Sequence, residues 1–258
     1  MENTLLVGLS RQMALSRELD VIANNVANID TTGFKADNAA FSEYLMPGAR
    51  DGDFTGKDRR VSFVQDRATW TDQSPGALER TGNPLDVAVD GKGYLVVQTQ
   101  RGLRYTRNGS FAISATGQLV TKDGDQVAAT GGAITFQPGD HNVSITANGI
   151  VTVSDASGTP DAPRGQLQIA SIDKPQLLQK DRGSMFVAPN GVNAGPAPQG
   201  THVVQGAIEK SNVRPVVEMA RMIQITRSYS DIATVLQQQG DQRRNALQQL
   251  SQQPNASS

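Results

Sequence analysis

Two segments at opposite ends of the chain carry apolar residues at helical spacing and have nearly equal length. Residues 4–28 and 213–239 would form helices of roughly 37 and 40 Å at about 1.5 Å per residue. No proline interrupts the first segment, and Pro215 lies in the first turn of the second, where its missing N–H is tolerated. Such helices are marginal alone in water, so each must bury its apolar face. The matched lengths favour a pair that meets in space over ordinary amphipathic helices that each pack on their own domain.

The apolar positions in these segments divide into a main seam and a secondary stripe. Steps of three and four residues along a helix place side chains on one face. The main seam consists of Leu15, Leu19, Ile22 and Val26 in the first segment, and of Met222, Ile225, Tyr229, Ile232 and Leu236 in the second. The secondary stripe consists of Leu6, Leu9 and Met13, and of Val216, Met219 and Ile223. We predict that the two main seams pack on each other within one chain.

Between the terminal segments the pattern changes to the alternation that is typical of β-strands. Candidate strands are residues 85–90, 94–97, 103–106, 118–121, 133–136, 142–145, 150–153 and 166–169. Gly-containing pairs such as Asn148-Gly149 and Asp123-Gly124 separate them and are typical of tight hairpin turns. Short strands without intervening helical patterns predict an antiparallel sandwich or barrel. The expected fold class is therefore α+β, with a β-rich domain inserted between paired terminal helices.

The predicted domain boundaries follow from these changes of pattern. The helical domain comprises residues 1–33 and 212–250, and the β-rich domain comprises residues 71–211. Residues 34–70 contain Pro47-Gly48 and Asp51-Gly52-Asp53 and are interpreted as an irregular connecting arm. Residues 190–200, rich in Gly and Pro, are expected to form a loop, and residues 251–258 a disordered tail.

Composition and motifs give little support to catalysis. The net charge is −1, which indicates no general attraction to nucleic acid or anionic membranes, and the chain has no cysteine. His141 and His202 stand alone, whereas zinc sites need several ligands. Arg101, Arg104 and Arg107 surround Tyr105, and we interpret them as a solvated hairpin rather than a nucleic-acid patch. We predict no catalytic residue, no metal site and no cofactor.

Targeting signals are equally sparse. No run of apolar residues is long enough for a transmembrane helix, and the N-terminus lacks the basic and apolar regions of a cleaved secretory signal. A cytoplasmic protein fits this, and so does export by a route that keeps its signal uncleaved.

Three separated blocks of sequence resemble the bacterial flagellar rod and hook proteins. Residues 23–35 read ANNVANIDTTGFK, like the N-terminal signature of that family. The central block comprises TGNPLDVAV at 81–89, YTRNG at 105–109 and GQLVT at 117–121, and the C-terminal block comprises SNV at 211–213, VEM at 217–219, MI at 222–223 and RSY at 227–229. Arg214, Pro215 and Ser230 depart from the family pattern. The blocks have the family's order and span nearly the whole chain, so the match is highly specific.

The resemblance implies a structural, non-enzymatic role in the flagellar basal body. Members of the family stack helically into a hollow axial tube with an inner layer of terminal helices and an outer β-rich domain. They are exported unfolded through the flagellum's own type III channel and reside in the periplasm-spanning rod. The implied partners are other rod proteins, copies of the same chain and the export apparatus, without nucleic acid or a small-molecule substrate. TTGFKAD at 31–37 and GKGY at 91–94 are closer to the proximal than to the distal rod type. A distal rod or hook-type axial protein is the alternative within the family. A monomeric β-rich enzyme or ligand-binding domain and an adhesin-like surface protein are the alternatives of other classes.

A growing tube needs heterologous faces that repeat, because two-fold contacts close after two subunits. We therefore expect the secondary stripe to face adjacent subunits. Asn24, Asn25 and Asn28 lie within five residues of each other, and asparagine is a poor helix-interior residue. They are expected to hydrogen-bond a neighbouring chain or to turn the helix end, with solvated amides at a frayed terminus as the alternative.

Overall fold

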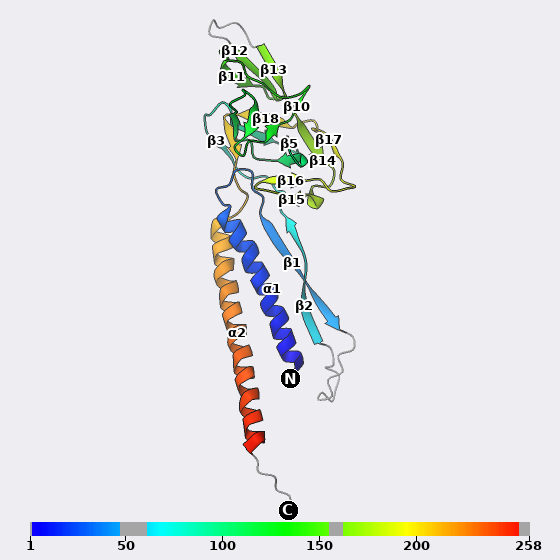
Figure 1. The fold of residues 1–258 in the computed structure, drawn as a ribbon, viewed down its shortest axis with the longest axis vertical. Coiled ribbons are helices and arrows are strands. Elements are labelled where there is room, and N and C mark those ends of the chain that lie inside the picture. Colours follow the sequence, from blue (N-terminus) through cyan, green and yellow to red (C-terminus); the bar gives the residue numbers. More distant parts are fainter. Residues whose placement is uncertain (1, 47–60, 155–161, 253–258) are drawn as a thin grey trace, which may run out of the picture. The chain divides into compact units, whose positions relative to one another are not determined.

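The chain divides into two compact units, each built from segments that are distant in sequence (Figure 1). The computed structural model describes residues 2–46, 61–154 and 162–252. Unit 1 comprises Met1–Val26, Asp37–Trp70 and Pro215–Ser258, and unit 2 comprises Ala27–Ala36 and Thr71–Arg214. The chain thus passes between the units at several points.

Unit 1 is built around the two terminal helices, α1 (Glu2–Ala27) and α2 (Pro215–Gln252), which lie side by side (Figure 1). The predicted pairing of the terminal helices is confirmed. Helix α2 begins at Pro215, as expected for a proline in a first turn, and Glu218 lies where its charge suits the positive helix end.

Helix α2 is longer than the sequence pattern predicts. It continues past Gln239 and Gly240 to Gln252, and so covers the first two residues of the predicted tail. A glycine inside a helix costs only about 1 kcal/mol relative to alanine, and the Arg, Ala, Leu and Gln residues that follow are good helix formers. Residues 253–258 of that tail lie outside the described residues.

A pair of strands also belongs to unit 1, where the sequence predicts an irregular arm. Strand β1 (Asp37–Met46) pairs with β2 (Val61–Thr71). The prediction of irregular structure is wrong for these residues, because the breakers that motivated it fall at 47–53, between the strands. Residues 47–60 lie outside the described residues.

Unit 2 is antiparallel throughout its described pairings, which confirms the predicted β-rich centre. Its largest sheet contains β5 (Tyr94–Thr99), β6 (Gly102–Thr106), β7 (Phe111–Ile113), β8 (Leu119–Thr121), β9 (Gln126–Val127), β14 (Ile169–Ile172), β15 (Gln179–Lys180), β16 (Met185–Val187) and β17 (Ala194–Pro196). A second sheet contains β10 (Ala129–Thr130), β11 (His141–Ile145), β12 (Ile150–Ser154) and β13 (Ala162–Leu167). A short 3-10 helix, η1 (Pro175–Leu177), precedes β15.

Two further strand pairs bring the C-terminal end of unit 2 against its beginning. Strand β18 (His202–Gln205) pairs with β4 (Val87–Asp90), and β19 (Ala207–Glu209) pairs with β3 (Leu78–Arg80). These pairings join residues more than a hundred positions apart. The last two strands of unit 2 therefore pair with the first two strands that lie wholly within this unit.

The core of unit 2 follows the period-two pattern of its strands. Strand β5 shows this most clearly, since Leu95 belongs to one buried cluster while Tyr94 and Val96 belong to another. The larger cluster contains Val87, Val89, Leu95, Phe111, Leu119, Val127, Ile134, Phe136, Ile145, Val151, Val153, Leu167 and Val203. The smaller one contains Tyr94, Val96, Tyr105, Ala170, Ile172, Leu178 and Phe186.

Three local predictions in unit 2 are wrong. Residues 133–136 form no strand: Thr135 makes an isolated bridge to Gln118, and Ile134 and Phe136 are buried core side chains that also hydrogen-bond through their backbones to Leu119 and Gly117. The predicted strand 166–169 is split between β13 and β14, and the predicted loop 190–200 contains β17. The structure also requires glycine at position 109, because a Cβ there would lie 1.7 Å from the Val87 carbonyl oxygen.

Candidate assembly interface

The main seam of the two helices is buried or half-buried in unit 1. Ile22 and Ile225 are its most buried members, with 1% and 6% of their surface exposed. The remaining predicted seam residues are half-buried: Leu15, Leu19, Val26, Met222, Tyr229, Ile232 and Leu236. Gly8 allows the helices to approach, since a Cβ at this position would lie 2.6 Å from Cδ2 of Leu236. Apolar burial along the seam is the main source of stabilisation for such a pair.

The secondary stripe lies on the exposed side of the same helices. Leu9 and Met13 on α1 are 49% and 66% exposed. On α2, Val216, Met219 and Ile223 are 80%, 52% and 56% exposed and share one face by their spacing. The side chain of Leu6 lies outside the described residues. Sequence reasoning missed Val217 and Val235, which are also exposed large apolar residues of α2. These side chains leave apolar surface exposed on α1 and along α2.

The three asparagines near the end of α1 have different surroundings. Asn25 is 1% exposed, and its amide both accepts from the Asp37 N–H at 2.9 Å and donates to the Asp37 carbonyl at 2.8 Å. It also donates to the Glu218 carboxylate of α2 at 3.4 Å. Asn25 therefore connects α1, β1 and α2 within unit 1. Asn24 is exposed, and Asn28 is half-buried and accepts a hydrogen bond from the Thr31 hydroxyl.

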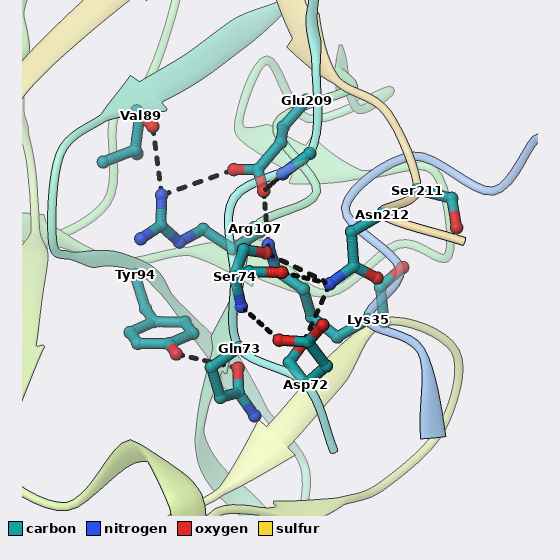
Figure 2. A network of polar contacts seen from close by, with 12 residues as sticks. Lys35, Asp72, Gln73, Ser74, Val89, Tyr94, Arg107, Glu209, Ser211 and Asn212 are labelled. Carbon is teal, nitrogen blue, oxygen red and sulfur yellow. Dashed lines mark hydrogen bonds and ion pairs between the residues drawn. The ribbon is translucent and has the colours of Figure 1, made fainter. Parts of the chain in front are cut away.

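A cluster of buried charges lies within unit 2 (Figure 2). We call Lys35, Arg107 and Glu209 the charge cluster. Lys35 Nζ lies 2.5 Å from one Glu209 carboxylate oxygen, and Arg107 lies 3.3 Å from the other. Their side chains are 1%, 7% and 1% exposed. Burial of charge is tolerable only with close partners of opposite sign and further hydrogen bonds.

Backbone carbonyls and a neighbouring ring complete the surroundings of the charge cluster. Lys35 donates to the Ser74 carbonyl, and Arg107 donates to the carbonyls of Val89 and Gly91. The Arg107 guanidinium also lies 5.1 Å from the ring centre of Tyr94, within range of a cation–π interaction. Burial lowers the pKa of Lys35 below its ordinary value of 10.5, and the charge and hydrogen bond of Glu209 partly offset this effect.

Asn212 connects the same segments through its side-chain amide (Figure 2). It accepts from the Ala36 N–H at 2.7 Å and donates to the carbonyls of Asp72 and Ser74 at 2.9 and 3.1 Å. The backbone adds a bond from the Gly33 N–H to the Glu209 carbonyl at 2.7 Å. Segments 33–36, 72–76 and 209–212, which continue into unit 1, are thus fixed to one another inside unit 2.

Sequence reasoning missed this charge cluster. Arg104 and Arg107, interpreted as part of a solvated hairpin, are both buried, so that interpretation is wrong for these two residues. The sequence offered one signal, since both arginines occur in or directly beside the predicted strand 103–106, next to the apolar residues Leu103 and Tyr105. Partners 102 and 174 residues away cannot be paired by spacing alone.

The described residues contain no arrangement suited to metal chemistry. No group of three or more His, Cys, Asp or Glu side chains is placed to hold a metal ion within the described ranges. His141 and His202 are both exposed. Among the described residues we also find no helix with a stretch long and apolar enough to cross a bilayer.

Three protein-family models match separate parts of this chain, in order along the sequence. Residues 5–35 match "Flagella basal body rod protein", residues 88–153 match "Flagellar hook protein FlgE/F/G D1 domain", and residues 204–249 match "Flagellar basal body rod FlgEFG protein C-terminal". The chain is 34% identical over 252 residues to the flagellar basal-body rod protein FlgF of Caulobacter vibrioides, with 97% of this chain and 98% of that protein covered. Identity to FlgF of Mesorhizobium japonicum is 33% over 261 residues, again with 97% and 98% covered. Identity to FlgG of Bacillus subtilis is 31% over 253 residues, with 92% and 94% covered.

Proposed function

We propose that the two faces of the helix pair have different structural roles. This proposal starts from the fact that this chain belongs to the flagellar basal-body rod protein family. The protein is an axial structural component of the rod and not an enzyme. Its family implies assembly with other rod proteins. The main seam holds the subunit together, and the secondary stripe contacts neighbouring axial subunits.

The observation that carries this proposal is the segregation of apolar residues on α2. Ile225 is 6% exposed, whereas Met219 and Ile223, within two turns of it, are 52% and 56% exposed. A helix that needed only to pack on its own subunit would place polar residues at those exposed positions. An apolar stripe beside a seam that is already packed is expected of a helix with partners on two sides.

The faces of the stripe are heterologous. Repeated addition of subunits requires that the surface on one subunit fits a different surface on the next. Copies of this chain and other rod proteins are the partners we assign to these surfaces. Asn24 and Asn28 belong to the same proposed contact, whereas Asn25 acts within the subunit through Asp37 and Glu218.

We further propose a position in the proximal rod and export in an unfolded state through the flagellar type III apparatus. The identities of 34% and 33% to proteins named FlgF, against 31% to one named FlgG, support the proximal over the distal type. A monomeric enzyme or ligand-binding domain is not favoured by any feature of the described residues.

Substitution of Met219 tests the proposed division. Met219→Asp places a charge on the stripe without touching the seam, so the protein should be secreted but fail to assemble, and cells should lose motility. Gln238→Asp, also at an exposed position of α2, is the matched control and should assemble normally. Normal assembly of Met219→Asp would exclude the stripe as a subunit contact.

A further inference from the structure

Glu209 forms ion pairs with two basic side chains, Lys35 and Arg107, that come much earlier in the chain. Lys35 lies 174 positions earlier and Arg107 lies 102 positions earlier, and each pairs with a different oxygen of the carboxylate. The first of these oxygens also accepts from the Gly76 N–H at 2.9 Å. One late residue therefore supplies the counter-charge for side chains contributed by two early parts of unit 2 (Figure 2).

The neighbours of Glu209 close the same region of unit 2. Ala207–Glu209 forms β19 against β3, and the Lys210 N–H donates to the Ala77 carbonyl. Asn212 then bonds to Ala36, Asp72 and Ser74. Segment 207–212 is thus in contact with two early parts of unit 2, namely the residues next to Lys35 and the segment 72–80.

Buried ion pairs of this kind add little net stability, because desolvation offsets the attraction. The charge cluster is also incompletely satisfied, since Arg107 Nε and the nearby Gln73 Nε2 are buried without a hydrogen-bond partner among the described residues. The consequence of removing one member is much larger, because the remaining charge stays buried without its partner. Without Glu209 in place, the packed unit would hold two buried cations that lack their shared carboxylate.

We infer that the charge cluster is a folding latch, in which unit 2 packs only once segment 207–212 brings Glu209 to Lys35 and Arg107. Earlier parts of the chain cannot reach this packed state alone. For a protein exported unfolded, such a latch delays folding until the C-terminal part is available. That use rests on the proposed function, whereas the latch rests on the geometry of unit 2.

The order of folding tests the latch directly in the full chain. In pulsed hydrogen exchange during refolding, we expect amides of β5 and β6 to gain protection together with those of 207–212, within about twofold in rate. Protection of β5 and β6 about tenfold faster than that of 207–212 would overturn the inference. Because purified protein is used, the result does not depend on whether the chain is exported.

Glu209→Gln tests the role of charge with almost unchanged shape. We expect it to slow the shared protection phase by at least about tenfold. The matched control is Glu79→Gln on the paired strand β3, whose ion pair with Lys210 is exposed, and its rate should stay within about twofold of wild type.

The double variant Lys35→Met/Glu209→Gln separates charge from packing. It removes one of the two cations that have lost the Glu209 carboxylate, so it should fold at least about threefold faster than Glu209→Gln alone. The inference is overturned if Glu209→Gln behaves like Glu79→Gln, or if the double variant folds more slowly than the single one. If Glu209→Gln does not fold at all, recovery in the double variant supports the latch and the order of protection in wild type remains decisive.

Discussion

Asn25 shows how one side chain can satisfy the backbone of a neighbouring segment. Its amide bonds to both the N–H and the carbonyl of Asp37, at the start of β1. Asn25→Ala removes both partners in a buried place, so the free energy of unfolding should fall by about 1–3 kcal/mol. Urea unfolding followed by helical circular dichroism measures this. Gln224→Ala, at an exposed site of α2, is the control and should change it by less than about 0.5 kcal/mol. A loss no larger than the control's would contradict the assigned role.

Asp181 gives unit 2 a defined response to acid. Arg104 donates to its carboxylate at 2.6 Å, and this hydrogen bond lowers the pKa of Asp181 below the ordinary value of 3.8. The unfolded chain therefore binds a proton at higher pH than the folded one, so the stabilising contribution is present above about pH 4 and is lost as the pH falls through the lowered value.

Asp181→Asn removes this titration. The urea midpoint should fall less between about pH 6 and pH 3 in the variant than in wild type. Asp123→Asn, the same chemical change at an exposed carboxylate in a hairpin turn, is the control and should change the free energy of unfolding at about pH 6 by less than about 0.5 kcal/mol. Equal falls in wild type and Asp181→Asn would show that this pair does not contribute.

At the scale of elements, the two faces of α2 should respond differently to charge. Ile225→Asp buries a carboxylate in the seam between α1 and α2 and should lower the free energy of unfolding by several kcal/mol, about 3–5. Met219→Asp, on the exposed stripe, should change it by less than about 0.5 kcal/mol. Thermal unfolding of the isolated protein, followed at helical wavelengths, distinguishes the two. Similar losses from both variants would mean that the stripe is part of the subunit's own core.

The helices and most central strands were predictable because their signals are local. Spacing of three and four residues identified the seam that contains Ile22 and Ile225, and alternation identified β5 and β12. Strands β1 and β2 were missed because the Gly- and Pro-rich residues between them outweighed the β-forming residues on either side. The opposite error occurred around Ile134, where the alternating apolar pattern predicted a strand. The structure has a loop there, and its apolar side chains cover the core.

The candidate site was predictable only in part, for a related reason. Helical periodicity separates two apolar stripes, and the structure places Ile225 inside and Met219 outside. Periodicity does not reveal that Asn25 bonds to Asp37, nor that Lys35 and Arg107 share Glu209. Those contacts depend on the three-dimensional path of the chain. The sequence does not show whether a given polar or charged side chain is buried with a partner or exposed to solvent.

At the scale of the molecule, the terminal segments serve two structural purposes. Helices α1 and α2 form the core of unit 1, while segments 33–36 and 209–212, adjacent in sequence to those helices, are fixed together in unit 2 by the charge cluster and Asn212. Segments near the two ends of the chain therefore contribute to the packing of both units.

The central claim is that the exposed stripe of the helix pair contacts neighbouring subunits. The chain has no cysteine, so single-cysteine variants carry a photo-crosslinker at one defined position. In purified basal bodies, Met219→Cys should give adducts with a second axial polypeptide, whereas Ile22→Cys, at 1% exposure in the seam, should give only adducts within the chain. Adducts confined to the chain at Met219, with intermolecular adducts from Ile22, would contradict the account.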